Sequence, residues 1–592
     1  MGNSQSSRPT SSHSKPRHTI TRQRSAVFSK LSLGCTSGNG SILGSDTSNE
    51  TLSLVNEKAA AFRERENDTQ QHQHNYRLRG QESYSSLAYS PPSDLAQDES
   101  TAAYNYFLRA FPEYQLTWIL DTLRRTDYSR LERNGETYVD YMGGALYPES
   151  LIRVHTSFLN DHILGNTHSV SNSSQLSAKC ASEAREAVLS FFRAPPEYTV
   201  VFTANATAAL KLVGEAYPFA AGGCYVLSAD SHNSVHGIRE YATHRGARIC
   251  YIPATPTGGV DTPTSKNFLL KNRPRSKETA PCLFALTGQS NITNAKNSLS
   301  LIEYAGSLGY HTLLDAAALV PTSVFSLSET PVDAMVVSFY KMFGFPTGVG
   351  ALVVKKSFLA QLERPWFAGG NVDVVQVPGN IVTRSHHLHE RFEDGTINYL
   401  NLPAVVDGLR FLSAYLPFLP LRLSSLLHYL TSSLTQLKHD TNGAPVVRIL
   451  SRLPKRRLMT VGEQADCGSI ISLIFLSPSG DMIPNSFVEY AASKESVSLR
   501  TGCMCNPGGA AAILSIQDDM KQLYPGVTLK DFEHHVGREL GVVRISFGLA
   551  SNFQDAWRVL KFASSIATEK SRQDLWSQWL QEKEKECVGQ AI

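Results

Sequence analysis

The chain has 592 residues, of which 56 are basic and 53 acidic, and this near balance gives no reason to expect nucleic acid as a partner. Its nine cysteines are an odd number in a long chain and a poor basis for a secreted disulfide framework, so we expect a reducing, cytoplasmic environment. The sequence contains no run of about 18 apolar residues, so no transmembrane helix is expected.

Residues 1–98 are rich in serine, asparagine, glutamine and arginine and hold few large apolar residues, so we expect a disordered tail. In the opening "MGNSQSS", Gly2 and Ser6 match the pattern for N-myristoylation. The basic, acid-free stretch that follows would supply the second signal that a peripheral membrane tether needs. The same composition is typical of an organellar transit peptide, and a tail with no targeting role is the third interpretation.

The folded body is expected from about residue 99, where helical runs begin to alternate with short apolar runs. The apolar runs lie at 198–204, 224–228, 248–252, 282–287 and 311–315. Alternation at this spacing predicts a parallel sheet covered by helices. Two further apolar runs follow, "DAMVVSF" and "TGVGALVVKKSFL", and the second is predicted to be antiparallel.

The second half of the chain changes character after a leucine-rich helical stretch at 403–437. The runs "CGSIISLIFLS" and "VVRISFGLAS" and an amphipathic helix at 553–567 predict a smaller α+β lobe. The expected domains are a large α/β domain at 99–425, a small α+β domain at 426–570 and a charged tail at 571–592. Segment 99–150 is expected to contribute to the small lobe.

Two residues at predicted strand ends suggest a cofactor site. Lys341 in "SFYKMFG" follows one apolar run, three residues after Ser338, and Asp315 ends the earlier run "HTLLD". The carboxyl ends of parallel strands meet at one edge of a sheet, where α/β proteins bind ligands. A lysine that can form a Schiff base and a carboxylate that can pair with a pyridinium nitrogen are the least that pyridoxal phosphate (PLP) requires. A solvated lysine is the alternative.

A phosphate cradle is predicted at "VVFTANATAALKL", where a strand, a turn of small residues and a helix follow one another. The first amides of a helix and its positive dipole end can hold an anion. Asn205, Ala206 and Thr207 would therefore surround a phosphate, although turns of this kind are common.

Two more strand ends could serve the cofactor ring. His232 in "SADSHNS" is placed to stack on the ring, and Gln289 or Asn291 in "LTGQSNITN" could reach the ring hydroxyl. Each of these residues would be an ordinary loop residue if it occurred alone.

The stretch "SLRTGCMCNPGG" places Cys503 and Cys505 one residue apart. A zinc half-site needs a second cysteine pair, and Cys467 stands alone in the preceding 200 residues. A disulfide between residues i and i+2 would be strained. Two interpretations remain at this point, a nucleophile on a loop and a pair of inert thiols.

The order of cradle, His232, Asn291, Asp315 and Lys341 resembles that of the class V aminotransferases. The segments "SFYKMFGFPTG" and "LRTGCMCNPGG" resemble the aminotransferase-like portion of eukaryotic molybdenum cofactor sulfurases, relatives of the cysteine desulfurases, over about residues 103–568. The resemblance implies an α/β, PLP-dependent transferase of fold type I, with a large, mostly parallel sheet domain and a smaller α+β domain. The C-terminal β-barrel of full-length cofactor sulfurases is expected to be absent.

The resemblance also implies residue roles. Lys341 would hold PLP, with Asp315, Ser338 and His232 around it. Arg500 and Cys505 match the desulfurase pattern R-x-G-x-x-C, which makes Cys505 the nucleophile that takes sulfur from L-cysteine as a persulfide and releases L-alanine. Arg500 would favour the thiolate. The glycine-flanked loop would let Cys505 swing outward.

The remaining expectations concern the substrate and partners. Arg544 would bind the substrate carboxylate, and no metal ligand is expected. A turn ending at Asn371, where the family has threonine, would reach the neighbouring subunit of a homodimer. Tyr141 replaces a family histidine and is expected to alter substrate entry. The sulfur acceptor would be the molybdenum cofactor or a partner protein. The alternatives are a general cysteine desulfurase, another class V enzyme such as a lyase or epimerase, and a non-catalytic interaction protein.

Overall fold

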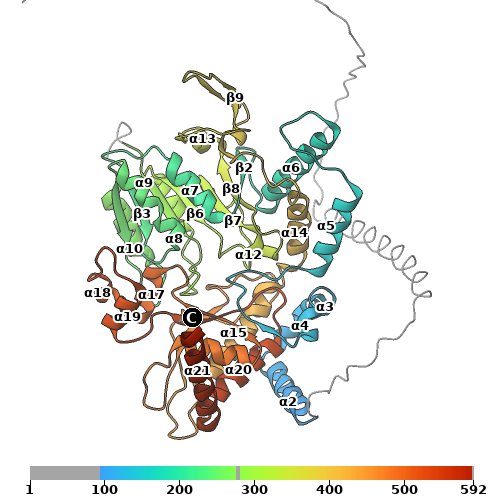
Figure 1. The fold of residues 1–592 in the computed structure, drawn as a ribbon, viewed down its shortest axis with the longest axis vertical. Coiled ribbons are helices and arrows are strands. Elements are labelled where there is room, and N and C mark those ends of the chain that lie inside the picture. Colours follow the sequence, from blue (N-terminus) through green and yellow to red (C-terminus); the bar gives the residue numbers. More distant parts are fainter. Residues whose placement is uncertain (1–93, 275–279, 590–592) are drawn as a thin grey trace, which may run out of the picture. The chain divides into compact units, whose positions relative to one another are not determined.

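The computed structural model describes residues 94–274 and 280–589 (Figure 1). The predicted tail and both proposed targeting signals lie outside the described residues, apart from residues 94–98. Those residues begin helix α2 (Asp94–Ala110), so regular structure starts before the predicted boundary at residue 99. The sequence of α2 contains neither glycine nor proline, so all 17 of its residues are compatible with a helix.

The larger sheet has seven strands in the order β2-β8-β7-β6-β5-β3-β4. Only β8 runs antiparallel to its neighbours, which confirms the predicted, mostly parallel sheet and its antiparallel strand. The strands are β2 (Tyr198–Thr203), β3 (Cys224–Ser228), β4 (Arg248–Ile252), β5 (Leu283–Thr287), β6 (His311–Asp315), β7 (Ala334–Ser338) and β8 (Gly350–Lys355).

Helices cover both faces of this sheet (Figure 1). Successive strand residues point to opposite faces, so Val200 and Phe202 pack into one apolar cluster and Val201 into the other. The strands are buried on both sides for this reason, as their near-continuous apolar sequences require. The helices in this part are α6 (Asn172–Phe191), α7 (Ala206–Ala216), α8 (Asn233–His236), α9 (Ile238–His244), α10 (Thr262–Asn272), α11 (Ser300–Ser307), α12 (Phe339–Phe343), α13 (Lys356–Leu359) and α14 (Leu402–Tyr415).

The predicted leucine-rich helical stretch at 403–437 consists of two helices. It forms α14 and α15 (Leu419–Gln436), which are bent by 65° at a break that contains Pro417. Proline lacks an amide hydrogen and its ring clashes with the preceding turn, so the first helix ends here. Within the described ranges, no single helix is long and apolar enough to cross a membrane, and α14 with α15 passes that test only as a bent pair.

A second sheet has four antiparallel strands in the order β11-β12-β15-β14. Its strands are β11 (Val447–Ile449), β12 (Ile470–Phe475), β14 (Arg500–Gly502) and β15 (Val542–Ser546). The accompanying helices are α16 (Asn485–Lys494), α17 (Pro507–Leu514), α18 (Gln517–Met520), α19 (Leu529–Val536), α20 (Phe553–Ala567) and α21 (Glu569–Gly589).

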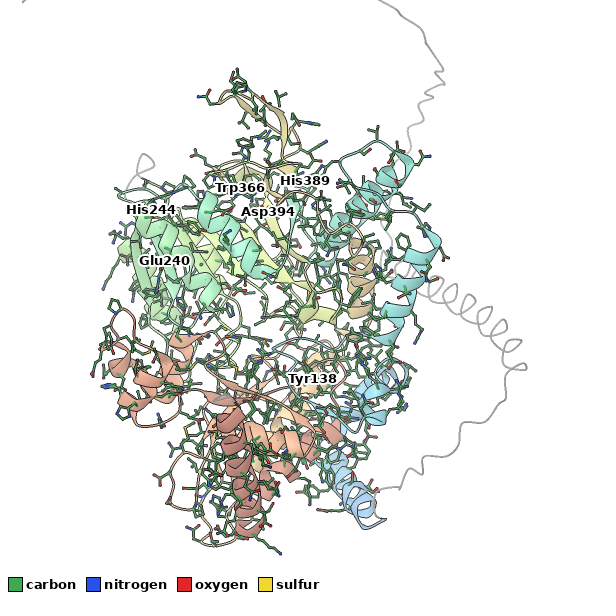
Figure 2. The ribbon with its side chains drawn as sticks, viewed as in Figure 1. Tyr138, Glu240, His244, Trp366, His389 and Asp394 are labelled. Carbon is green, nitrogen blue, oxygen red and sulfur yellow. The ribbon has the colours of Figure 1, made fainter. Side chains whose placement is uncertain are left out.

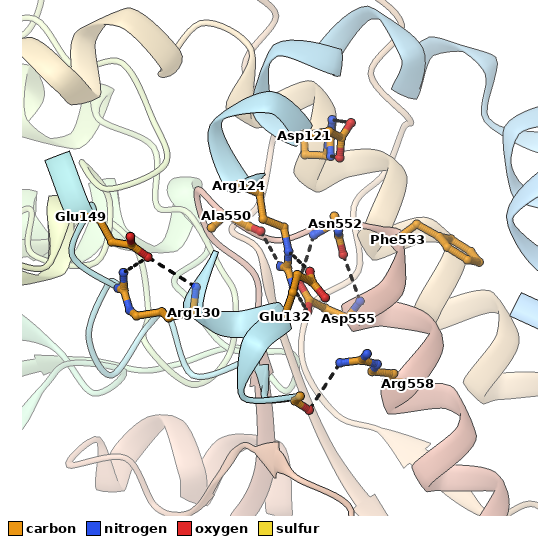
Figure 3. A network of polar contacts seen from close by, with 12 residues as sticks. Asp121, Arg124, Arg130, Glu132, Glu149, Ala550, Asn552, Phe553, Asp555 and Arg558 are labelled. Atoms are coloured by element: carbon orange, nitrogen blue, oxygen red, sulfur yellow. Dashed lines mark hydrogen bonds and ion pairs between the residues drawn. The ribbon is translucent and has the colours of Figure 1, made fainter. Parts of the chain in front are cut away.

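The segment before the larger sheet packs against this second sheet. Strand β1 (Thr137–Tyr138) pairs with β13 (Val497–Ser498), and Asp140 bridges to Ser546 of β15. Figure 3 shows a buried ion pair between the two, where Arg124 of α3 binds Asp555 of α20 at 2.6 Å. The other elements here are η1 (Pro112–Thr117), α3 (Trp118–Asp127), α4 (Arg130–Arg133) and α5 (Glu149–Asp161).

A hairpin of β9 (Val372–Val375) and β10 (Val382–Arg384) extends from the larger sheet (Figure 1). At its foot, Arg384 donates a hydrogen bond to the carbonyl oxygen of Trp366, which Figure 2 labels near His389 and Asp394. The short helix η2 (Glu390–Phe392) follows. The hairpin exposes apolar side chains, namely Val374, Val377 and Ile381.

Candidate active site

A cavity of about 120 Å³ lies at the carboxyl ends of β2, β3, β5, β6 and β7. The structure brings all eight residues expected to bind a cofactor together in its wall, and Gln289 and Tyr340 also line it. The eight are Asn205, Ala206, Thr207, His232, Asn291, Asp315, Ser338 and Lys341. They come from separate loops because parallel strands end at the same edge of the sheet.

The start of α7 forms one end of the cavity. The side chain of Asn205 accepts a hydrogen bond from the Ala208 amide at 2.9 Å and so caps the helix. The Ala206 amide donates to Ser338 Oγ at 2.8 Å. A Cβ at Gly350 would lie 2.6 Å from the backbone of Asn205, so β8 can run this close only with glycine there. An anion fits this end because the positive end of the helix dipole lies here and the hydroxyl-bearing Thr207 and Ser338 line the cavity beside it.

Lys341 lies on α12, directly after β7, and is half-buried. Burial lowers the pKa of Lys341, and the guanidinium groups of Arg544 and Arg500 lower it further, while Asp315 and Cys505 oppose this effect. The amine is therefore more readily neutral, and hence nucleophilic, than that of an exposed lysine.

His232 caps the short helix α8, where its Nδ1 accepts a hydrogen bond from the Ser234 amide at 3.1 Å. In the neutral ring the proton consequently lies on Nε2. Burial lowers the pKa of His232 and Lys341 lowers it further, against the effect of Asp315, so the neutral form is favoured. A neutral ring suits stacking on an aromatic cofactor.

Asn291 lines the cavity, but its amide group is already engaged. Its Nδ2 donates to the Met504 carbonyl oxygen at 2.6 Å, and its Oδ1 accepts from Asn506 at 3.1 Å. Gln289 is 1% exposed, and neither polar atom of its side chain has a hydrogen-bond partner among the described residues. Gln289 is therefore the freer amide for a ligand, since a buried polar group without a partner is costly.

Arg544 lies on β15 and is 2% exposed. Its Nη2 donates to Asp140 Oδ1 at 2.6 Å and its Nη1 to the Asn291 carbonyl oxygen at 3.0 Å. Arg500 binds the other carboxylate oxygen of Asp140 at 2.9 Å. Asp140 thus orients both arginines. No local sequence pattern singles out Asp140, because its partners lie 360 and 404 residues away.

Cys505 is exposed on the short loop between β14 and α17, and Cys503 is half-buried. Cys505 is therefore the more accessible of the two thiols. Burial raises the pKa of Cys503, and Glu533 raises it further, so Cys503 forms a thiolate less readily than a free cysteine. The loop is anchored on both sides of the cysteine, by the hydrogen bond from Asn291 to the Met504 carbonyl oxygen and by the buried Asn506. Within the described part of the chain, no group of three histidine, cysteine or acidic residues could hold a metal ion.

Tyr141 does not line the cavity, so the expected effect on substrate entry has no direct basis. Its ring packs 5.1 Å from that of Tyr138 and lies against Gly548, in the apolar core. Asn371 is buried, and its Oδ1 accepts from the Ala368 amide at 2.8 Å. It serves a local turn within this chain.

Comparisons with known proteins agree with this architecture. The model of the aminotransferase class-V family matches residues 137–559. A molybdenum cofactor sulfurase of Solanum lycopersicum is 32% identical over 478 residues, which cover 75% of this chain and 57% of that protein. The Homo sapiens molybdenum cofactor sulfurase is 34% identical over 473 residues, covering 75% of this chain and 51% of its own length. The chain thus spans little more than half the length of these relatives.

Solved structures show the same fold. The apo structure of a cysteine desulfurase from Thermococcus onnurineus NA1 superposes with a TM-score of 0.59 at 21% identity, covering 76% of this chain and 98% of that one. The cysteine desulfurase CsdA from Escherichia coli gives 0.58 at 20% identity, with the same coverage.

Proposed function

Because this chain belongs to the aminotransferase class-V family, a family of PLP enzymes, we propose that it mobilises sulfur from L-cysteine as a persulfide on Cys505 and releases L-alanine. The observation that carries the proposal is the neighbourhood of two reactive groups. Lys341 and Asn291 line the cavity, and the loop that carries Cys505 contacts its wall: the Met504 carbonyl oxygen accepts a hydrogen bond from Asn291 at 2.6 Å, and the Cys505 carbonyl oxygen accepts one from the Asn233 amide at 2.7 Å. A thiol beside the cavity and an amine inside it are what sulfur removal requires.

The residues present fit PLP. The start of α7 offers the positive end of its dipole to the phosphate, Asp315 offers a carboxylate at a strand end, and Gln289 offers a buried side chain with no partner among the described residues. Lys341 would hold the aldehyde carbon. When bound, PLP withdraws electrons from the substrate Cα, which makes its hydrogen acidic and the Cβ–S bond labile.

Each protein group then has a defined task. Arg544 binds the substrate carboxylate through N–H groups that Asp140 leaves free. Lys341, whose pKa is lowered by burial, removes the Cα proton. The Cys505 thiolate attacks the substrate sulfur, so the S–S bond forms as the Cβ–S bond breaks. Protons delivered to the substrate carbons complete alanine, and the sum is L-cysteine plus Cys505 thiol giving L-alanine plus Cys505 persulfide.

The test is mass spectrometry of the PLP-loaded protein after addition of L-cysteine and trapping with an alkylating reagent, with alanine measured in the same sample. We expect a persulfide on the peptide that contains Cys505, and equal alanine in the first turnover. Cys505→Ser should abolish the persulfide, Lys341→Ala should abolish both products, and Cys503→Ser is the matched control that should retain both. A Cys505→Ser protein that forms persulfide at the normal rate would refute the assigned nucleophile.

Two further outcomes would point to other functions. Bound PLP without persulfide or alanine would favour another class V reaction, such as that of a lyase or epimerase. A failure to bind PLP would favour a non-catalytic interaction protein.

We also propose that the working unit is a homodimer and that the sulfur acceptor is the molybdenum cofactor or a partner protein. The exposed apolar side chains of the β9–β10 hairpin support self-association. The names of the relatives motivate the molybdenum acceptor. Light scattering of the loaded protein would test the dimer, and transfer of 35S from the persulfide to added molybdenum cofactor would test the acceptor.

A further inference from the structure

The loop that carries Cys505 has an unusual backbone. Met504 and Cys505 both have φ of 54°, in the left-handed region that side chains other than glycine rarely adopt. Such a conformation persists only when the surrounding structure fixes it. The loop must therefore be held by contacts outside itself.

Those contacts come from the loops at the carboxyl edge of the larger sheet. The Met504 carbonyl oxygen accepts a hydrogen bond from Asn291, and the Cys505 carbonyl oxygen accepts one from the Asn233 amide at 2.7 Å. The next residue, Asn506, is 0% exposed and inserts its side chain between these loops. The nucleophile is thus bracketed by anchored positions while its own side chain stays exposed.

Asp230 organises this anchor. It is 0% exposed, and its Oδ1 accepts from Asn506 Nδ2 at 2.7 Å and from Ser290 Oγ at 2.6 Å. Its Oδ2 accepts from the Gly259 amide at 2.6 Å and from Thr293 Oγ1 at 2.7 Å. These four hydrogen bonds fix the orientation of the Asp230 carboxylate, and Oδ1 is therefore held in place as the acceptor for Asn506.

The chemistry of the partners permits a single orientation of each amide. Asn506 Oδ1 accepts from the Gly509 amide at 2.9 Å, so its Nδ2 must face the Asp230 carboxylate. The same Nδ2 donates to Asn291 Oδ1, which turns the Asn291 nitrogen toward the Met504 carbonyl oxygen. One directional chain of hydrogen bonds therefore runs from Asp230 to the residue before Cys505.

We propose that Asp230 and Asn506 are positioning residues that dock the Cys505 loop on the cavity in the geometry for sulfur transfer. The inference rests on the proposed function and adds to it. Proton transfer by Lys341 does not need the docked loop, whereas attack of the thiolate on the substrate sulfur does. Because the loop is docked and Cys505 is exposed, an acceptor must come to the persulfide at the protein surface.

The test uses Asn506→Ser in the full, PLP-loaded chain. Serine keeps an oxygen for the Gly509 amide and so keeps the helix cap, but it removes both donors of the Asn506 amide nitrogen. Two rates are compared with wild type. One is exchange of the L-alanine Cα hydrogen with D2O, which reports on Lys341 without Cys505, and the other is single-turnover persulfide formation on Cys505.

We expect alanine exchange within about twofold of wild type and persulfide formation at least about tenfold slower, because a hydrogen bond to a charged group is lost. Backbone amide exchange of the peptide 498–514, measured without substrate, should accelerate by a similar factor of about ten. The matched control is Asn552→Ser, which changes the N-cap of α20 and should alter none of the three rates.

Persulfide formation within twofold of wild type would overturn the inference, and so would an equal fall of both rates in a folded variant. If Asn506→Ser does not fold, Asp230→Asn provides the same test, because it retains the side-chain shape while replacing the carboxylate charge. Wild-type protein that exchanges alanine but forms no persulfide would instead overturn the proposed function, and this inference with it.

Discussion

Replacing Arg124 with methionine is expected to destabilise the protein by about 3–5 kcal/mol, because it leaves a buried carboxylate without its charge partner. The guanidinium of Arg124 binds both oxygens of Asp555, at 2.6 and 3.1 Å. It also donates to Glu132 at 2.8 Å and to the Ala550 carbonyl oxygen at 2.7 Å (Figure 3). Arg124 is 3% exposed and Asp555 1%, so water replaces few of these bonds in the variant.

The pH dependence of this effect follows from Asp555. Burial raises the pKa of Asp555, and Arg124 opposes the rise, so Arg124→Met raises that pKa further. The folded state then binds the proton more tightly than the unfolded state. Protonation of Asp555 therefore adds to the free energy of unfolding. This contribution is fully present below the pKa that Asp555 has in the unfolded chain, and it is lost as the pH rises through the pKa that Asp555 has in the folded protein. The deficit of Arg124→Met should therefore shrink as the pH falls.

Urea unfolding at several pH values measures this effect, with Trp118 on α3 and Trp557 on α20 as fluorescent reporters. Arg558→Met is the matched control on α20, since Arg558 makes one hydrogen bond of 3.5 Å, and it should cost less than about 0.5 kcal/mol. Adding Asp555→Asn to Arg124→Met should recover part of the loss.

A cost below about 1 kcal/mol for Arg124→Met, which is the range of an exposed ion pair, would refute the reasoning. A deficit that does not change with pH would refute the role assigned to Asp555.

Two further substitutions test the cavity. Arg500→Met should raise the pKa of Lys341, because Arg500 helps to lower it, so the acid limb of PLP loading followed by absorbance should move to higher pH. An unchanged profile would contradict this coupling. Gln289→Leu should change the stability of the PLP-free protein by less than about 0.5 kcal/mol, since no hydrogen bond is lost, but weaken PLP binding about 2–10-fold in an absorbance titration. A destabilised variant with unchanged PLP affinity would exclude Gln289 as a cofactor contact.

Much of the larger sheet could be predicted from sequence. Strands β2, β3, β4, β5 and β6 match the predicted apolar runs to within one residue, because short apolar runs between helical segments are typical of strands buried on both faces. The cofactor residues could be predicted for a related reason. Each ends or follows a strand, and the parallel arrangement of the strands brings these ends to one edge of the sheet.

Other features depended on contacts between distant segments. The carboxylate of Asp140 lies between Arg500 and Arg544, and no local pattern around Asp140 indicates either partner. Tyr141, beside it in sequence, packs into the core instead of the cavity. The leucine-rich stretch at 403–437 is helical as predicted, but its 65° bend between α14 and α15 is not visible in its apolar composition.

The sequence by itself determined which chemical groups gather at the cavity, since the order of strands and motifs along the chain can be read without knowing how side chains pack. Only the tertiary structure decided which of those groups are free. Asn291 is tied to the Cys505 loop, Gln289 has no partner among the described residues, and Asp230 binds Asn506, the residue after the nucleophile. The physical reason is that each buried polar atom must find a partner, and packing of distant segments chooses that partner.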